Sequence, residues 1–439
     1  MKKREIERLD GELRDYVGSM VGDLGRSERR AALGWYITGL LLDGERKSIG
    51  AMAGRLAPEA QQEAMRQRLQ QAVSVASWNE EVVWCRLAQK IDAELPELEA
   101  LVLDHTGMPK KGKHSVGVAR QYCGTLGRVD NCQVVTSLHL AGERGSACIG
   151  MRLFLPEAWA QDLPRRRRVG VPDEVVFQKK WELALGLLDQ ALTFGVRRHV
   201  VLGDAEFGDA TEFRQELDQR ALRSVLGISG THRVWPPWAE LCPPCRAPGQ
   251  AGKDPTWWTS EDEPVAIQDL ALIVSEAAYE RVYWRQGSQG RQSSRFVALR
   301  VRPAENWHKG KAQPPAAEVW LLCEWPRGEQ EPTKFWLSTL PEDTPIKMLV
   351  RLAKLRWRVE RDYQEMKQEV GLDHFEGRTW AGLHHHGALC ALAHGFLALR
   401  RGLFPPQTAA VDSADGPSST PGGRAPLDRQ MPPLHAPLP

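Results

Sequence analysis

The sequence lacks several features that would assign it to a common class. No stretch of the chain approaches the roughly 18 unbroken apolar residues of a membrane span. The first residues, MKKREIERLDGEL, carry too many charges for a secretory signal. The eight cysteines are scattered and form no disulfide-like framework. We therefore expect a cytoplasmic protein that does not cross a membrane.

Close cysteine pairs are almost absent as well. The one pair, Cys242 and Cys245, stands in a Pro-rich stretch. A structural zinc site needs four ligands, and the only obvious further donor nearby is His232. We therefore favour a Pro-rich loop over a zinc site at this place.

A strong charge of one sign is also missing, because 58 Lys and Arg residues stand against 56 Asp and Glu residues. The net charge of +2 therefore neither excludes nor identifies an acidic partner. The basic residues are bunched, however, at residues 110–113, 165–168 and 351–367. Such bunching suits contacts with phosphate groups better than an even distribution does. The run 165–168 fits a solvated loop and a phosphate-binding patch equally well.

The length of the chain predicts two or three packed units. In residues 1–95, apolar residues such as Leu33, Tyr36 and Leu40 recur at helical spacing, so this part is predicted to be a separate helical domain. The later boundaries enclose the first part of an α/β core (96–229), a β-rich insertion (230–340), the last part of the core (341–402) and a Pro-rich tail (403–439). The tail has too few apolar residues to pack and is expected to be disordered.

The core segment alternates short apolar runs with helical patterns. Strands are predicted at 98–104, 117–123 and 131–140, then a helix at 174–194, a strand at 199–203, a helix at 209–220 and a strand at 222–228. Three hairpin-linked strands followed by parallel crossovers are typical of an RNase H-like fold, an α/β mixed sheet flanked by helices. Further strands are predicted in the insertion at 281–284, 295–301, 319–323 and 334–337.

Two of the predicted core strands end in an aspartate. Asp104 follows the apolar run 101–103 and precedes a basic, Gly-rich loop, and Asp204 follows the run 200–203. A strand-terminal aspartate taken singly is often only a turn or cap former. Because the crossovers bring the two strand ends together, we expect both carboxylates to face one crevice. Gly203 and Gly208 allow the backbone to approach closely there.

A long helix predicted at 344–370 supplies a third carboxylate. Arg356, Glu360, Tyr363 and Lys367 follow one another at i, i+4, i+7 and i+11 and form one stripe beside an apolar face. For an arbitrary helix such a stripe is a solvated face with ion pairs. The two strand-terminal aspartates favour a functional interpretation instead.

On these residues the chain resembles insertion-sequence transposases of the DDE superfamily, in the branch with the signature Tyr-x2-Arg-x3-Glu-x6-Lys. Arg356, Glu360 and Lys367 stand at the Arg, Glu and Lys positions, and Ala353 stands where the signature has Tyr. The stretches GKHSVGVARQYCGTLGRVDNCQ and GLDHFEGRTWAGLHHH also look like blocks of one subgroup. The resemblance covers residues 32–396. The departure at Ala353 affects one DNA-positioning contact and not the acidic residues.

The resemblance implies a metal-dependent enzyme that cleaves and joins DNA. Asp104, Asp204 and Glu360 would be the catalytic residues and would hold two Mg2+ ions, with Mn2+ as a substitute. Two such ions about 3.5 to 4 Å apart can activate a water or a 3′-hydroxyl and stabilise the departing oxygen. On this view Asp104 bridges both ions, Asp204 holds one and Glu360 holds the other.

The resemblance also implies partners. These are double-stranded DNA, namely transposon ends and target, and a second copy of the chain in a homodimer on DNA, with the protein associated with the bacterial nucleoid when bound. The N-terminal helices are expected to read the terminal inverted repeats. The expected DNA-binding residues are Lys110, Lys111, Lys113, Arg120, Trp284, Arg356, Lys367 and Arg378.

Three alternatives stay open. Trp284 either stacks on an unpaired base or is an ordinary core aromatic. The run His384–His386 is expected to cap a helix or contact DNA and not to chelate a metal, because consecutive helical residues point in different directions. The whole chain is either an active transposase or a catalytically inactive, transposase-derived DNA-binding protein, since its tail is Pro-rich and His105 stands where an acidic residue is common.

Overall fold

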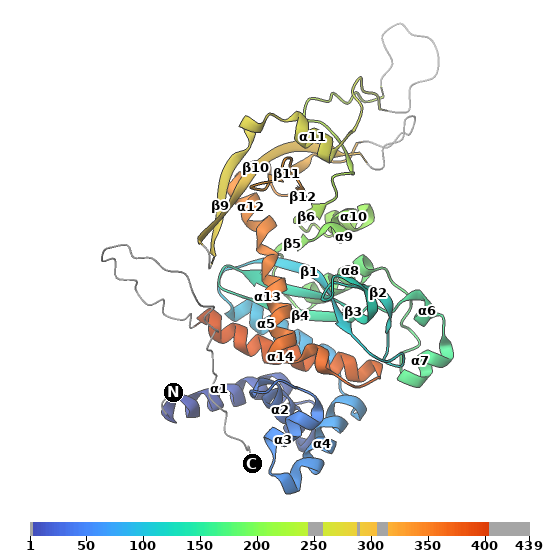
Figure 1. The fold of residues 1–439 in the computed structure, drawn as a ribbon, viewed down its shortest axis with the longest axis vertical. Coiled ribbons are helices and arrows are strands. Elements are labelled where there is room, and N and C mark those ends of the chain that lie inside the picture. Colours follow the sequence, from blue (N-terminus) through green and yellow to red (C-terminus); the bar gives the residue numbers. More distant parts are fainter. Residues whose placement is uncertain (1–2, 245–257, 288–289, 305–314, 404–439) are drawn as a thin grey trace, which may run out of the picture.

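The computed structural model describes residues 3–244, 258–287, 290–304 and 315–403. Cys245 and the predicted tail from residue 404 onward lie outside these residues. Within the described ranges, no helix combines the length and the apolar character needed to cross a membrane. Figure 1 shows an elongated molecule with the N-terminal helices at one end and a β-rich region at the other.

The N-terminal part is helical, as the spacing of its apolar residues predicts. It contains α1 (Lys3–Val21), α2 (Ser27–Leu41), α3 (Ile49–Leu56), α4 (Gln62–Gln70) and α5 (Glu80–Glu94). Leu33, Ile37 and Leu87 are fully buried in a hydrophobic core that continues without interruption into the last helix, α14 (Trp380–Leu403), and the central sheet. The N-terminal helices therefore share one core with α14 and one face of the central sheet.

The central sheet begins with four strands in antiparallel pairs and continues with two parallel ones. The elements are β1 (Leu98–Pro109), β2 (Ala119–Cys123), β3 (Arg128–Gly142), β4 (Ser146–Leu153), α6 (Glu157–Ala160), α7 (Leu163–Val169), α8 (Lys180–Thr193), β5 (Val200–Gly203), α9 (Ala205–Gly208), α10 (Thr211–Gln219) and β6 (Ser224–Ile228). β3 pairs with β1, β2 and β4 in antiparallel fashion, and β1, β5 and β6 run parallel. This mixed sheet with flanking helices is the predicted RNase H-like arrangement.

Three details of the sequence prediction are wrong in this region. The strand β4 is not predicted, yet it pairs with β3 and completes the antiparallel half of the sheet. β1 does not end at Asp104, because its pairing with β3 continues to Pro109. The predicted helix at 174–194 begins only at Lys180. In each case contacts with distant parts of the chain determine where the element begins or ends. Local residue patterns carry no information about these contacts.

The insertion extends the same sheet. It contains β7 (Arg233–Trp235), β8 (Val265–Ala266), α11 (Ile267–Ile273), β9 (Glu280–Gly287), β10 (Gly290–Pro303), β11 (Val319–Trp325) and β12 (Lys334–Ser338). All four strands predicted here are confirmed. β12 pairs antiparallel with β6, so the strand order is β2-β3-β1-β5-β6-β12-β11-β10-β7-β8. Figure 1 shows these strands above the central part of the sheet.

Two helices replace the single one predicted at 344–370. α12 (Ile346–Leu355) and α13 (Trp357–Gln368) are separated at Arg356, where the amide of Val359 donates to the Arg356 carbonyl three residues back. Both cover the face of the sheet that carries Val102 and Leu202. Helices α8 and α10 pack against the opposite face. A short turn, η4 (Leu372–His374), then leads to α14.

Helix α14 lies between the sheet and helices α1 to α4, with α5 beside it against β4 (Figure 1). His384, His385 and His386 are all buried in it. His385 stacks on Trp78 at 3.9 Å between ring centroids, and His386 contacts the Tyr36 hydroxyl at 2.8 Å. The expectation that these histidines cap a helix or contact DNA is therefore wrong, because His385 and His386 join α14 to the N-terminal part and His384 contacts the Leu153 amide of β4.

Candidate active site

The parallel strands β1 and β5 set the positions of the two aspartates. Val102 is the partner of Leu202 at the end of their pairing, and Asp104 and Asp204 each follow two residues later. Side chains two residues apart on a strand share a face, so Asp104 points to the face that α13 covers. The two carboxylates consequently lie at the same level of neighbouring strands.

Asp104 is buried, with 8% of its surface exposed. One carboxylate oxygen accepts from the His105 amide at 2.8 Å, and the other accepts from Arg356 Nη1 at 2.8 Å. Burial raises the pKa of the Asp104 carboxyl to about 6; Arg356 opposes this rise, and the charges of Asp204 and Glu360 add to it. Three negative groups thus act on one another around Asp104.

Asp204 stands where β5 turns into the short helix α9. Its carboxylate accepts from the Glu206 amide at 3.0 Å and caps the helix. Gly208 is required here, because a Cβ added to it would lie 1.7 Å from the Gly227 carbonyl oxygen. The close approach predicted for Gly208 is therefore confirmed, and Asp204 has the cap-forming role of an ordinary strand-terminal aspartate in addition to its place near Asp104.

Glu360 reaches this group from the first turn of α13. Its side chain is 66% exposed and lies 3.4 Å from Arg356 Nη2. Since Arg356 also bonds Asp104, its guanidinium links the two carboxylates. Tyr363 of the same predicted stripe is 8% exposed, so the stripe is not a solvated face at this position.

A pocket of about 490 Å³ opens beside Asp204 and Glu360. Its walls come from the ends of β5 and β6, from α12 and α13, and from β12 of the insertion. The cationic and aromatic side chains Lys334, Trp336, Lys354 and Trp357 line it, and the sequence analysis did not single them out. Only the pairing of β12 with β6 brings two of them here, and no local pattern encodes that pairing.

The donor chemistry of this group suits a hard cation. Asp104, Asp204 and Glu360 offer carboxylate oxygens, which divalent ions such as Mg2+ prefer, and the mutual repulsion evident at Asp104 is what a cation relieves. Among the residues that the structure describes, no three Asp, Glu, His or Cys side chains lie close enough together to form a metal site. The Arg356 guanidinium holds the intervening position between Asp104 and Glu360.

A buried network of polar groups joins α13 to β3 and β4. Asp362 accepts from His139 Nδ1 at 2.7 Å, which leaves His139 Nε2 to accept from Ser137 Oγ at 2.8 Å. Ser137 Oγ in turn accepts from the Tyr363 hydroxyl at 2.5 Å. Asp362 also accepts from Ser146 Oγ at 2.6 Å. Every member has a partner, so the network holds α13, and with it Glu360, against β3 and β4.

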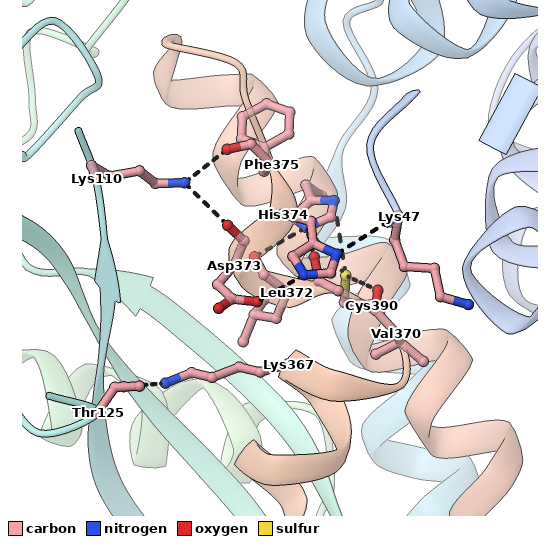
Figure 2. Close-up of polar contacts among 12 residues, drawn as sticks. Lys47, Lys110, Thr125, Lys367, Val370, Leu372, Asp373, His374, Phe375 and Cys390 are labelled. Atoms are coloured by element: carbon pink, nitrogen blue, oxygen red, sulfur yellow. Dashed lines mark hydrogen bonds and ion pairs between the residues drawn. The ribbon is translucent and has the colours of Figure 1, made fainter. Parts of the chain in front are cut away.

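Two of the lysines expected to contact DNA are engaged with the protein itself. Lys367 Nζ donates to Thr106 Oγ1 at 2.5 Å, to the Gly107 carbonyl at 2.9 Å and to Thr125 Oγ1 at 2.6 Å. Lys110 Nζ donates to the Phe375 carbonyl at 2.7 Å. Figure 2 shows Lys110 directed at Asp373 in η4 and at Phe375 just after it, and Lys367 directed at Thr125. Their roles as phosphate ligands stay predictions.

The other expected DNA contacts are distributed over the surface. Lys111, Lys113, Arg120 and Arg378 are exposed. Trp284 is half-buried on β9, with its ring 5.8 Å from that of Phe296 and the Lys354 ammonium 5.0 Å above it. It is not among the residues that line the pocket. Its packing is that of a core aromatic, and its role in holding a base stays a prediction.

Residues 19–291 match the family of DDE superfamily endonucleases, and since this is more than half of the chain, the chain belongs to that family. The matched range includes Asp104 and Asp204 and ends before Glu360. A probable transposase for the insertion sequence element IS701 of Microchaete diplosiphon is 31% identical over 136 residues, which are 30% of this chain and 33% of the relative. The chain thus matches about a third of that relative's length. Enzymes of this superfamily generally use divalent metal ions.

Proposed function

We propose that the chain is a DNA transposase that cleaves and joins DNA strands at the ends of an insertion sequence, with Asp104, Asp204 and Glu360 as its catalytic residues. The observation that carries the proposal is the position of Asp104 and Asp204 at the same level of β1 and β5, together with the bonds of Arg356 to Asp104 and Glu360. Membership of the DDE endonuclease family and the likeness to a probable insertion-sequence transposase support it.

The three carboxylates would hold two Mg2+ ions, or Mn2+ ions in their place. When bound, the ions supply activation of a water or 3′-hydroxyl and stabilisation of the departing oxygen. Arg356 pairs with Asp104 and Glu360 in the metal-free protein and lines the pocket, where its guanidinium can contact a phosphate. Lys334 lines the β12 wall of the pocket, where it attracts the DNA backbone, whereas Lys354 is paired with the buried Glu324. The N-terminal helices would bind the terminal repeats, and two copies would pair on DNA.

The test is a nicking assay on the purified full chain with Mg2+ and a duplex that carries the element's own ends. Asp104→Ala, Asp204→Ala and Glu360→Ala are each expected to abolish nicking while end binding is retained, because each removes a metal ligand and no DNA anchor. Asp269→Ala, at an exposed position of α11, is the matched control and is expected to nick normally. Normal nicking by any one of the three variants would contradict the assignment of that residue.

One observation favours a second candidate, a transposase-derived protein that binds DNA without cutting it. Among the described residues, no three candidate ligands are close enough to hold a metal, and Arg356 bridges two of the carboxylates. The same assay separates the candidates. Wild-type protein that binds the ends and fails to nick them with both Mg2+ and Mn2+ supports the second candidate and overturns the first.

A further inference from the structure

A second pocket, of about 280 Å³, lies on the side of α13 that faces away from Glu360. The turn between β3 and β4, helix α13 and the end of α14 enclose it. Four arginines line it, against two carboxylates: Arg144, Arg358, Arg361 and Arg401 against Asp362 and Glu365. The proposed function assigns no role to this pocket.

The carboxylates at the base of the pocket are already satisfied by protein groups. Asp362 has His139 and Ser146 as partners. Glu365 accepts from Arg361 Nε at 2.8 Å and from Arg401 Nη1 at 2.6 Å. Arg361 and Arg401 are thereby paired within the pocket. The carboxylates of the pocket do not balance the positive charge of the other two arginines.

Arg144 and Arg358 are the unbalanced pair. Arg144 Nε contacts Glu97 at 3.1 Å, but both side chains are nearly half-exposed, and such surface pairs are weak. Arg358 donates to the Glu143 carbonyl, and its Nε is buried with no hydrogen-bond partner among the described residues. A buried donor without a partner is uncommon and fits a site that an anion completes.

The pocket adjoins the candidate active site through one residue. Trp357 lines both the 490 Å³ pocket and this one. Its ring lies 3.9 Å from the Arg285 guanidinium and 4.6 Å from that of Arg358. A DNA strand that extends from Asp204 and Glu360 across Trp357 therefore passes between the guanidinium groups of Arg285 and Arg358 and reaches the second pocket.

We propose that this arginine pocket binds a backbone phosphate of the DNA strand that runs from the candidate active site over Trp357. The proposal rests on the proposed function, because it needs DNA in the neighbouring pocket. Guanidinium groups suit it, since their paired N–H groups match phosphate oxygens. The excess of positive charge in a small pocket, with satisfied carboxylates beneath it, favours one singly charged phosphodiester over an apolar or cationic ligand.

The test is duplex binding by the full chain, measured by fluorescence anisotropy over a series of KCl concentrations. Arg144→Gln is expected to weaken binding about tenfold at low salt and to reduce the slope of log affinity against log salt by about 1, as the loss of one phosphate contact does. Arg144→Lys, which keeps the charge, should recover part of the affinity. Arg198→Gln removes an exposed arginine before β5, at the opposite end of that strand from Asp204, and is the matched control.

Thermal unfolding of each variant shows whether a loss of binding is a loss of folding. Arg144 has one weak surface partner, so Arg144→Gln is expected to melt with the wild type. An unchanged affinity and salt slope in Arg144→Gln, with normal binding by the wild type, overturns the phosphate pocket and leaves the proposed function intact. A wild-type protein that binds no duplex overturns both. A change in sedimentation of the DNA-free protein, with DNA binding unaltered, identifies a protein contact instead and also overturns the proposal.

Discussion

The two sides of helix α13 carry carboxylates of opposite character. Glu360 is 66% exposed and has one partner, Arg356, at 3.4 Å, whereas Asp362 and Glu365 are buried and bonded by His139, Ser146, Arg361 and Arg401. A buried carboxylate with all its partners supplied by the protein stabilises the fold, and one left largely unpartnered beside other carboxylates is available for a ligand. On the proposed function, the hydrogen-bond partners distinguish the two structural acids from the proposed catalytic one within six residues of one helix.

The largest expected effect is a loss of stability on the side of α13 that carries the buried Asp362. Asp362→Ala leaves His139 Nδ1 and Ser146 Oγ buried without an acceptor, so we expect the free energy of unfolding to fall by about 3 to 5 kcal/mol. Glu360→Ala is expected to change it by no more than about 0.5 kcal/mol. Urea unfolding of both variants measures the difference. Equal losses of stability in the two variants would remove the distinction between the two sides of the helix.

The second prediction concerns Asp104 and pH. Its pKa of about 6 in the folded protein is above the ordinary value of 3.8, so its ionisation opposes folding: the penalty is complete above pH 6 and vanishes below about pH 4. In metal-free buffer, Asp104→Asn should therefore gain stability relative to the wild type between pH 4 and pH 8, by at most about 3 kcal/mol. Urea unfolding at both pH values measures the gain.

Added Mg2+ provides the control for Asp104. It is expected to raise the melting temperature of the wild type above pH 6, since a ligand that binds only the folded state stabilises it, and to have a smaller effect on Asp104→Asn. A stability difference between the two proteins that is the same at pH 4 and pH 8 would show that Asp104 ionises normally.

The smallest expected effect separates two roles of Lys367. Its ammonium donates to Thr106, Gly107 and Thr125, so Lys367→Met should lower the free energy of unfolding by about 1.5 to 3 kcal/mol, the contribution of hydrogen bonds to a charged group, and leave end binding nearly unchanged. Lys111→Met, at an exposed position, is the control. If Lys367→Met keeps the stability of the wild type and loses affinity for DNA, Lys367 is a phosphate ligand, as the signature motif implies.

Much of the architecture follows from local patterns. The alternating runs of the insertion predict β9 to β12, and the apolar run before Asp204 predicts β5, because each strand carries its own periodicity. Strand β4 cannot be predicted from an alternation of apolar and polar residues, because Ser146–Leu153 is buried almost throughout and shows no such alternation. The end of β1 cannot be predicted from this alternation either, because the pairing with β3 extends the strand to Pro109, beyond Asp104.

The candidate site follows from the sequence only as far as its three acids and Arg356. Asp104, Asp204 and Glu360 are identified by strand ends and motif spacing, but Trp336 and Lys334 reach the pocket through a strand pairing over a long separation. The arginine pocket combines residues from the β3–β4 turn and from two helices. Tertiary convergence of this kind leaves no periodic signal, so the sequence treats Arg144 and Arg401 as ordinary surface charges.

The pairing of β6 with β12 also determines how the chain folds during synthesis. Leu226 finds its partner Leu337 about 110 residues later, so at about 5 to 20 residues per second the ribosome leaves one edge of β6 unpaired for about 5 to 20 s. An unpaired apolar strand edge is a template for association with other chains. A nascent chain halted within the insertion consequently displays this edge permanently, and aggregation is the expected fate of such truncated products.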